Sequence, residues 1–271
     1  MDEDGSGLPE RQENAVKGDH GHVLVVAGSC RYTNTPSIAA LGALRTGTDL
    51  VTVAAPDRSA RLAPSFALNI VSDPLDGLRL GPDHVDTVLE RAGEADCLAV
   101  GPGLGRADAT QDAVVDILDA YGGGAVVDAD AIHAAADQPA VLEDCVVTPH
   151  AGEFDVLTGE HPGDTVDDRI DAVTQAADDL DCTVLLKGPQ DVVSDGERTE
   201  QVDAGNPYMT RGGTGDVLTG AAAGLVAQGL DRFDAAVTAA QVNGEAGDRA
   251  LEQHGEGFLL EELLDELAEV V

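Results

Sequence analysis

The sequence predicts an α/β fold in which a mainly parallel central sheet carries helices on both faces. Short runs rich in Val, Leu and Ile alternate with amphipathic or Ala-rich stretches along most of the chain. Several strand-like runs end in Gly, Asp or His, and ligands bind beyond the carboxyl ends of strands in such sheets. Hydrophobic residues make up 43% of the 271 residues and aromatic residues only 3%, so the core must consist mainly of aliphatic side chains.

The predicted strands come first along the chain, and a hairpin follows them. The seven expected parallel strands are residues 22–27, 50–54, 69–72, 97–100, 125–128, 146–148 and 183–187. Residues 191–194 and 198–202 flank Asp195-Gly196, which is a hairpin signal and predicts antiparallel strands at one edge.

Helical spacing of apolar residues occurs between the strands and throughout the last third of the chain. The predicted helices are residues 36–45, 82–91, 110–121, 166–180, 214–228, 233–253 and 259–270. Thr35 is the expected N-cap of the first helix, with Pro36 in its first turn. We expect residues 1–19 to form a flexible lead-in and residues 20–271 to form a single domain, because we find no internal repeat or linker.

The charge balance is strongly acidic. Asp and Glu number 51 against 15 Lys and Arg, the net charge is −36, and the only lysines are Lys17 and Lys187. Acidic residues spread along the whole chain predict a protein that works in very high salt, where self-repulsion is screened. The alternatives are an unusually acidic mesophilic protein or a protein that binds basic partners. Nucleic acid is disfavoured as a partner, because its phosphates are bound through Lys and Arg.

The cysteines and the apolar runs predict a cytoplasmic protein. Cys30, Cys97, Cys145 and Cys182 are far apart, which favours small buried hydrophobes over a disulfide framework or a zinc site. No run is long and apolar enough to span a membrane, and residues 1–12 are too polar for a signal peptide.

The segment Gly212-Gly-Thr-Gly-Asp216 carries the strongest chemical signal. Its glycines allow the backbone to approach a ligand, and the following helix begins with amide groups that have no helical acceptor. Gly213, Thr214 and Gly215 are therefore the expected anion hole, suited to phosphate charge. Asp216 in the first turn is placed as a general base. The alternative is that Asp216 only caps the helix and complements its dipole.

Other strand ends supply further candidates. Lys187-Gly188 follows an apolar strand, where the ammonium would neutralise phosphate or simply be solvated. His150 and Glu153 follow another strand, and Gly101-Pro-Gly-Leu-Gly105 follows a third. Asp128 and Asp130 end a fourth strand. These two acids would hold a magnesium ion, or Asp130 would only cap a short helix from residue 131.

In this order, the segments resemble the ADP/ATP-dependent NAD(P)H-hydrate dehydratase family, which has the three-layer ribokinase-like fold. The likeness runs from about Lys17 to the C-terminus. The motifs that carry it are residues 26–29 (Val-Ala-Gly-Ser), 43–47 (Ala-Leu-Arg-Thr-Gly), 101–105, 148–153 (Thr-Pro-His-Ala-Gly-Glu), 186–188 (Leu-Lys-Gly), 205–207 (Gly-Asn-Pro) and 212–220. Gly-Thr-Gly-Asp is shared with many kinases of this fold, whereas the whole set is more specific.

The resemblance implies dehydration of the S-epimer of NAD(P)H hydrate to NAD(P)H, with a nucleotide, ADP rather than ATP, as phosphoryl donor and Mg²⁺ as cofactor. It assigns catalysis to Asp216. The substrate-binding residues it implies are Thr35, Gly105, His150 and Asp216, and the nucleotide-binding residues are Lys187, Gly188, Pro189, Gln190, Asp191 and Gly215. No protein metal ligand is implied. A homotetramer and a functional partnership with a separate NAD(P)H-hydrate epimerase are also implied.

The sequence departs from the family pattern in a few places. Asn34-Thr35 stands where Gly-Ala is expected, Asp49 stands where Gly is usual, and Asn243 replaces a His. Two other functions stay open. One is a small-molecule hydroxyl kinase of the same fold, such as a thiamine-precursor kinase, and the other is a non-catalytic nucleotide sensor.

Overall fold

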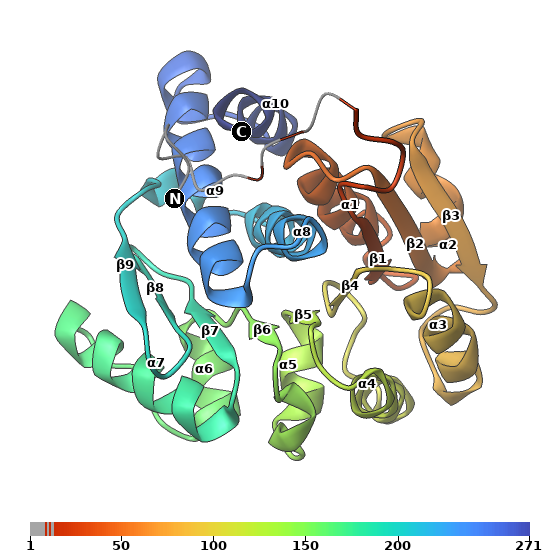
Figure 1. Cartoon of the computed structure of the whole chain (residues 1–271), viewed down its shortest axis with the longest axis horizontal. Helices are drawn as coiled ribbons and strands as arrows, with labels where there is room; N and C mark the ends of the chain where they lie inside the picture. The colour runs from red at the N-terminus through yellow and green to blue at the C-terminus, as the bar shows by residue number, and fades with distance from the viewer. Residues whose placement is uncertain (1–8, 10, 12–13) are drawn as a thin grey trace.

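A mixed sheet forms the middle layer of the molecule (Figure 1). The computed structural model describes residues 9, 11 and 14–271, so most of the predicted lead-in before residue 14 lies outside the described residues. Within them the sheet has nine strands in the order β3-β2-β1-β4-β5-β6-β7-β8-β9. The strands are β1 His22–Val26, β2 Leu50–Pro56, β3 Ile70–Leu75, β4 Cys97–Val100, β5 Val126–Val127, β6 Val146–Val147, β7 Thr183–Leu186, β8 Asp191–Ser194 and β9 Thr199–Val202.

The pairing of these strands matches the sequence prediction. Strands β1 to β7 are parallel, while β8 pairs antiparallel with both β7 and β9. The hairpin at one edge and the parallel remainder are therefore confirmed. The chain runs from β1 outward to β3 and then returns to β4 on the other side of β1. This reversal is a topological switch point, where ligands bind in open α/β sheets.

Helices cover both faces of the sheet, which confirms the three-layer α/β fold. The helices are α1 Thr35–Arg45, α2 Asp57–Leu62, α3 Val85–Ala92, α4 Asp108–Tyr121, α5 Asp130–Ala135, α6 Ala151–Thr158, α7 Val166–Leu180, α8 Thr214–Ala227, α9 Arg232–His254 and α10 Leu260–Val270. Helices α1, α2, α8 and α9 bury apolar residues on one face, and α3 to α7 do so on the other. The short helices α2 and α6 were not predicted, because six and eight residues give too little periodicity.

The start of α1 differs from the prediction. Thr35 is the first helical residue and not the N-cap; Asn34 precedes the helix and makes no side-chain cap bond. The Thr35 hydroxyl instead donates to the carbonyl oxygens of Tyr32 and Pro102, each at 3.1 Å. The side chain thus ties the start of α1 to the loop after β4.

Helices α1 and α8 pack with their backbones in direct contact. A Cβ atom on Gly220 would overlap the carbonyl oxygen of Ala39, and one on Gly42 would overlap that of Val217. Glycine is therefore required at both crossing points. This close approach brings the first turn of α8, which carries Asp216, beside the first turn of α1, which carries Thr35.

Asp49 has a local structural role. Its Oδ2 atom accepts hydrogen bonds from the amides of Gly18 at 2.9 Å and His20 at 3.3 Å, and its Oδ1 atom pairs with Arg11. The carboxylate thereby holds the segment before β1 against the start of β2.

The remaining sequence predictions concern cysteines and membranes. Cys97, Cys145 and Cys182 are buried free thiols, as expected, but Cys30 is exposed, so the prediction of burial is wrong for that residue. None of the described helices has the length and apolarity needed to cross a membrane.

Candidate functional site

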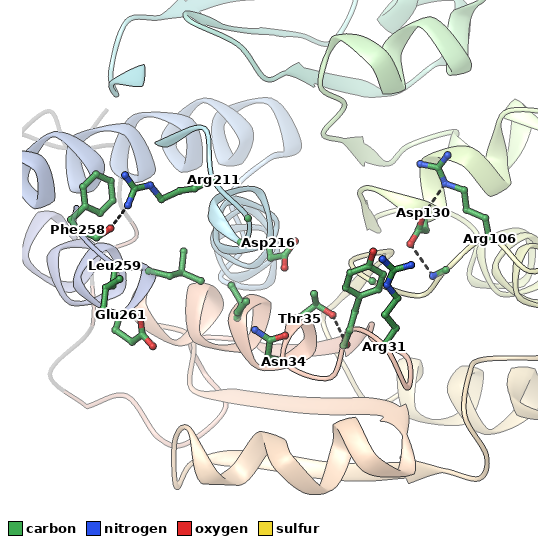
Figure 2. Close-up of a pocket in the computed structure, with 17 residues that line it drawn as sticks. Arg31, Asn34, Thr35, Arg106, Asp130, Arg211, Asp216, Phe258, Leu259 and Glu261 are labelled. Atoms are coloured by element: carbon green, nitrogen blue, oxygen red, sulfur yellow. Dashed lines mark hydrogen bonds and ion pairs between the residues drawn. The ribbon is translucent and has the colours of Figure 1, made fainter. Parts of the chain in front are cut away.

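A cavity of about 940 Å³ opens at the carboxyl ends of β1 and β4, at the switch point of the sheet. Its wall is built from four parts of the chain: residues 31–38, residues 103–106 with Asp130, residues 211–216 and residues 258–261. Figure 2 shows Asp216 between the polar end at Arg31 and Asp130 and the apolar end at Phe258 and Leu259. The structure therefore brings Thr35, Gly105 and Asp216 to one cavity.

Asp216 lies in the first turn of α8. Helix α8 begins at Thr214 after Gly213, whose φ is 103°, and a Cβ on Gly213 would stand 2.6 Å from Leu260 Cδ2. Among the described residues, none donates a hydrogen bond to the Asp216 carboxylate, so this carboxylate does not cap the helix. Burial raises the pKa of Asp216 to about 7, the Asp128 carboxylate adds to the rise, and Lys187 opposes it. A carboxylate with a pKa near neutrality is suited to general base chemistry.

The backbone before Asp216 presents donors. Val217 makes the first helical bond, to the carbonyl oxygen of Gly213. Within the described chain, the amides of Gly213, Thr214 and Gly215 donate to no acceptor. The Thr214 hydroxyl donates to the carbonyl oxygens of Met209 and Arg211 and so fixes the loop. These amides at a helix N-terminus suit an anion.

Lys187 belongs to a buried ionic network rather than to the solvent. Its ammonium nitrogen lies 2.7 Å from Asp128 Oδ1 and 3.9 Å from Glu153 Oε2, and its side chain is 19% exposed. Burial acts to lower the pKa of Lys187, but the carboxylates of Asp128, Glu153 and Asp216 outweigh it and leave the pKa raised. A Cβ atom on Gly215 would lie 3.3 Å from this ammonium. Lys187 therefore remains charged beside the first turn of α8.

Asp128 holds that network together. It is 1% exposed, and it accepts hydrogen bonds from the hydroxyls of Thr148 and Thr219, each at 2.9 Å, in addition to the Lys187 ammonium. The buried carboxylate thus has a cation and two neutral donors, which satisfies it. These bonds join the end of β5 to β6, β7 and α8.

Asp130, two residues later, points to the other side. Its Oδ2 atom accepts from the Gly105 amide at 2.8 Å, and its Oδ1 atom accepts from Arg106 Nε at 3.1 Å. Asp128 and Asp130 therefore do not converge on one ion. Among the described residues, no group of three or more His, Cys, Asp or Glu could hold a metal. Asp130 does not cap α5 either, since it is the first helical residue and no side-chain cap bond is present.

The loop from Lys187 to Asp191 forms a second region next to Lys187. The Gly188 amide donates to Asp191 Oδ1 at 2.8 Å. Burial raises the pKa of Asp191 to about 6, opposed by the Gly188 amide, Lys187 and Arg169. This loop does not line the cavity at Thr35 and Gly105. Gly215 and Asp216 therefore lie between two regions, one at the cavity and one at the loop.

Arg169 of α7 supports that loop, although no sequence pattern indicates this residue. Its side chain is buried and donates to the carbonyl oxygens of Gln190 at 3.1 Å and Leu186 at 3.4 Å. A Cβ on Gly188 would overlap its guanidinium. An Arg within an amphipathic helix has no pattern that distinguishes it from a surface residue.

His150 lies outside the cavity lining. It is the N-cap of α6, where its Nδ1 atom accepts from the Glu153 amide at 3.2 Å while its own amide donates to Glu153 Oε2 at 2.9 Å. Its neighbour Pro149 accepts from the Lys187 amide at 2.8 Å. The structure thus places His150 beside the Lys187 network through Glu153, and its side chain is 60% exposed.

Arg211 and Phe258 are further residues that the sequence did not indicate as cavity residues. The Arg211 guanidinium donates to the carbonyl oxygens of Phe258 and Glu256, and it stacks over the Phe258 ring at 4.5 Å. These contacts hold residues 258–261 against the cavity. Arg31 supplies a second cation at the opposite end, over the Tyr32 ring at 5.2 Å.

Comparison with known proteins decides the family. Residues 23–269 match the family described as NAD(P)H-hydrate dehydratase. The chain belongs to the NAD(P)H-hydrate dehydratase family. A "Bifunctional NAD(P)H-hydrate repair enzyme Nnr" of Pyrobaculum aerophilum is 41% identical over 263 residues, which are 96% of this chain and 52% of that protein. The chain spans about half the length of this relative and of the next two.

A shorter relative matches over most of both chains. The "ADP-dependent (S)-NAD(P)H-hydrate dehydratase" of Cenarchaeum symbiosum is 38% identical over 257 residues, covering 92% of this chain and 87% of that one. Among solved structures, the Bacillus subtilis ADP/ATP-dependent NAD(P)H-hydrate dehydratase, co-crystallized with ATP/Mg²⁺, has a TM-score of 0.80 and 25% identity, covering 99% of this chain and 96% of that one. A ribokinase-like superfamily protein of Enterococcus faecalis shares the fold, with a TM-score of 0.85 and 20% identity over 99% of this chain and 93% of its own.

Proposed function

We propose that the chain dehydrates the S-epimer of NADH or NADPH hydrate to NADH or NADPH, using a nucleotide as phosphoryl donor and releasing phosphate. The observation that carries this proposal is the position of Asp216. Its carboxylate faces the cavity, has a pKa of about 7 because of burial, and lies next to free backbone amides. Membership of the family supplies the substrate class.

Asp216 takes the proton from the ring hydroxyl of the hydrated nicotinamide. The hydroxyl oxygen then bonds to the terminal phosphorus of the nucleotide, and the bond between that phosphorus and its bridging oxygen breaks. Amides of Gly213, Thr214 and Gly215 bind the charge on the phosphoryl oxygens. In the second step the carbon–oxygen bond breaks, phosphate leaves, and loss of a proton from the adjacent ring carbon restores the double bond.

Two regions flank Asp216 and divide the binding roles. Thr35 and Gly105 contact the hydrated dinucleotide in the cavity. Lys187 to Asp191, together with Gly215, contact the nucleotide, and the Lys187 ammonium attracts its phosphates. The His150 ring is exposed and lies outside the cavity lining. It therefore has to move when the ligand binds in order to contact the substrate.

ADP is the proposed donor, because two relatives that match nearly over their whole length carry the name ADP-dependent. Mg²⁺ would come to the site on the nucleotide phosphates and neutralise their charge. The amides of Gly213, Thr214 and Gly215 and the Lys187 ammonium would hold the phosphates that carry the ion.

The assay that tests this function adds hydrated NADH or NADPH to the protein with magnesium and either ADP or ATP, and follows the return of NADH absorbance. Free phosphate should appear in equal amount. A stable phosphorylated alcohol would instead indicate a hydroxyl kinase. Binding of nucleotide with no turnover by the wild type would indicate a sensor, and recovery with neither nucleotide in salt that keeps the protein folded would refute the proposal.

The wider setting is also proposed. The net charge of −36 supports an enzyme of a halophile, and we propose that the enzyme works in the cytoplasm. Activity should therefore rise with KCl concentration into the molar range. We further propose one domain over residues 20–271, a homotetramer and cooperation with an epimerase. Light scattering and an assay with both epimers, with and without an added epimerase, test the last two.

A further inference from the structure

The three residues that follow β5 reach both regions of the site. Asp128 is bonded to Lys187 on the nucleotide side, at 2.7 Å. Asp130 is bonded to the Gly105 amide in the cavity wall, at 2.8 Å. Only Ala129 separates them, so any movement of this turn moves both contacts.

The backbone of this turn is strained and tightly enclosed. Ala129 has φ 51° and ψ −119°, a conformation that residues with a Cβ atom rarely adopt. Gly101 packs against the turn so closely that a Cβ atom on it would overlap the Asp128 carbonyl oxygen. Strain of this kind persists only where the surroundings fix the backbone, and it is concentrated at functional sites.

We propose that the turn Asp128–Ala129–Asp130 positions the two halves of the site together: Asp128 fixes the Lys187 ammonium beside Gly215 and Asp216, and Asp130 fixes Gly105 in the cavity wall. This inference rests on the function proposed above. Asp128 is a positioning residue, because it lies behind Lys187 and contacts no part of the cavity. Asp130 itself lines the cavity, and it also holds the loop of residues 101–105 through the Gly105 amide.

The charges around Asp216 predict the direction in which its pKa changes when Asp128 is neutralised. Asp128 at the end of β5 and Lys187 after β7 both face Asp216, and Glu153 of α6 faces Lys187. His150 contacts Glu153 in turn. The negative charge of Asp128 disfavours a second carboxylate charge nearby. Asp128→Asn therefore lowers the pKa of Asp216 and leaves Lys187 free to approach Asp216.

The two lysines make a direct test possible. In protein labelled with ¹⁵N only in lysine, the ammonium groups of Lys17 and Lys187 give separate signals, and Lys17 is exposed. We expect the Lys187 ammonium protons to exchange with water about tenfold faster or more in Asp128→Asn, because a charge-assisted hydrogen bond is lost. Lys17 should not change. Equal exchange of Lys187 in both proteins would overturn the proposal, and the measurement requires no turnover.

The activity measurement separates the two halves. In Asp128→Asn the acidic limb of the kcat/KM profile should move to lower pH, whereas a purely structural defect would lower activity without moving the limb. In Asp130→Asn the KM for the hydrate should rise about tenfold with the KM for nucleotide unchanged. Equal changes in both KM values, or an unmoved limb, would contradict the proposal. An inactive wild type would refute the function alone, since the lysine signals still decide the inference.

The controls keep the test decisive. Asp73→Asn removes a carboxylate that pairs with Arg91 at the edge strand β3, so it should change neither lysine signal nor either KM. If Asp128→Asn does not fold, Thr219→Val replaces it. That change removes one of the three donors to Asp128 and keeps its charge, so the Lys187 ammonium should exchange modestly faster while the acidic limb stays in place. Unchanged Lys187 exchange in this variant would contradict the proposal.

Discussion

Gly220 of α8 lies against Ala39 of α1 with no room for a side chain: a Cβ atom on Gly220 would overlap the Ala39 carbonyl oxygen. The two helices carry Asp216 and Thr35 at their first turns, so their separation sets the width of the cavity between these residues. The distance between Asp216, the proposed base, and Thr35, a proposed substrate contact, is thus determined by a backbone-to-backbone contact.

Gly220→Ala should force α1 and α8 apart and destabilise the protein. Overpacking of a core typically costs about 1–3 kcal/mol, and thermal unfolding in high salt would measure the loss. Activity at a temperature where the variant remains folded should also fall, because Asp216 moves away from Thr35. Gly257→Ala is the control, since a Cβ there meets nothing within 4 Å. Equal stability of both variants would show that the helix contact can relax.

Asp216→Asn should reduce turnover by about 10²–10⁴-fold, the usual contribution of general acid–base catalysis, while nucleotide binding by calorimetry persists. In the wild type, kcat/KM should fall as the pH drops through the Asp216 pKa of about 7. A wild-type profile that stays flat between pH 6 and 8 would remove Asp216 as the base.

The same group predicts a stability effect of defined sign. Because the folded-state pKa of Asp216 is raised from 3.8 to about 7, the folded protein binds the proton more tightly than the unfolded chain does. Ionised Asp216 therefore destabilises the fold above pH 7, and its contribution to stability declines as the pH rises from about 4 to 7. Asp216→Asn should raise Tm at pH 8, with a gain that shrinks toward pH 4. A gain independent of pH would contradict the raised pKa.

Arg169→Met should weaken nucleotide binding without affecting the hydrate. The change leaves the carbonyl oxygens of Leu186 and Gln190 without their donor and removes the support of Gly188. An affinity loss for ADP of about tenfold is expected from one hydrogen-bonded charge, measured by calorimetry. Arg91→Met, at the far edge of the sheet, should bind ADP like the wild type. Parallel changes in hydrate KM would mean that the whole fold had shifted.

Ala129→Gly separates strain from function. Relief of a rare backbone conformation offers about 1–3 kcal/mol, partly offset by the larger entropy of glycine in the unfolded chain. Tm should therefore stay equal or rise, while kcat falls because the turn no longer holds both contacts. Asp181→Gly, also at positive φ but at the end of α7, should preserve both Tm and kcat. An active Ala129→Gly with unchanged kcat would show that the strain has no catalytic role.

The sequence predicted the parts of this molecule that depend on local pattern. Alternating aliphatic runs located the strands, and Asp195-Gly196 located the hairpin. The glycines before Asp216 predicted amides with no helical acceptor, as found. Each of these signals extends over a few consecutive residues, so tertiary structure had little opportunity to override it.

Contacts between residues that are far apart in the sequence could not be predicted from local patterns. Asp128 and Asp130 read as a pair of possible magnesium ligands, yet the strained Ala129 turns them to opposite regions. Two of the three partners of Asp128, Lys187 and Thr219, lie 59 and 91 residues away. Arg211 and Phe258 are 47 residues apart, and they meet where the segment between α9 and α10 lies against the loop before α8. A capping role for Thr35 was wrong because the loop after β4 offers its hydroxyl a carbonyl oxygen.

The wall of the cavity runs from Arg31 to Glu261, and Arg211 holds the last part of it in place. Residues 258–261 are thus tied through one side chain to the loop before α8, so the width of that end of the cavity depends on Arg211.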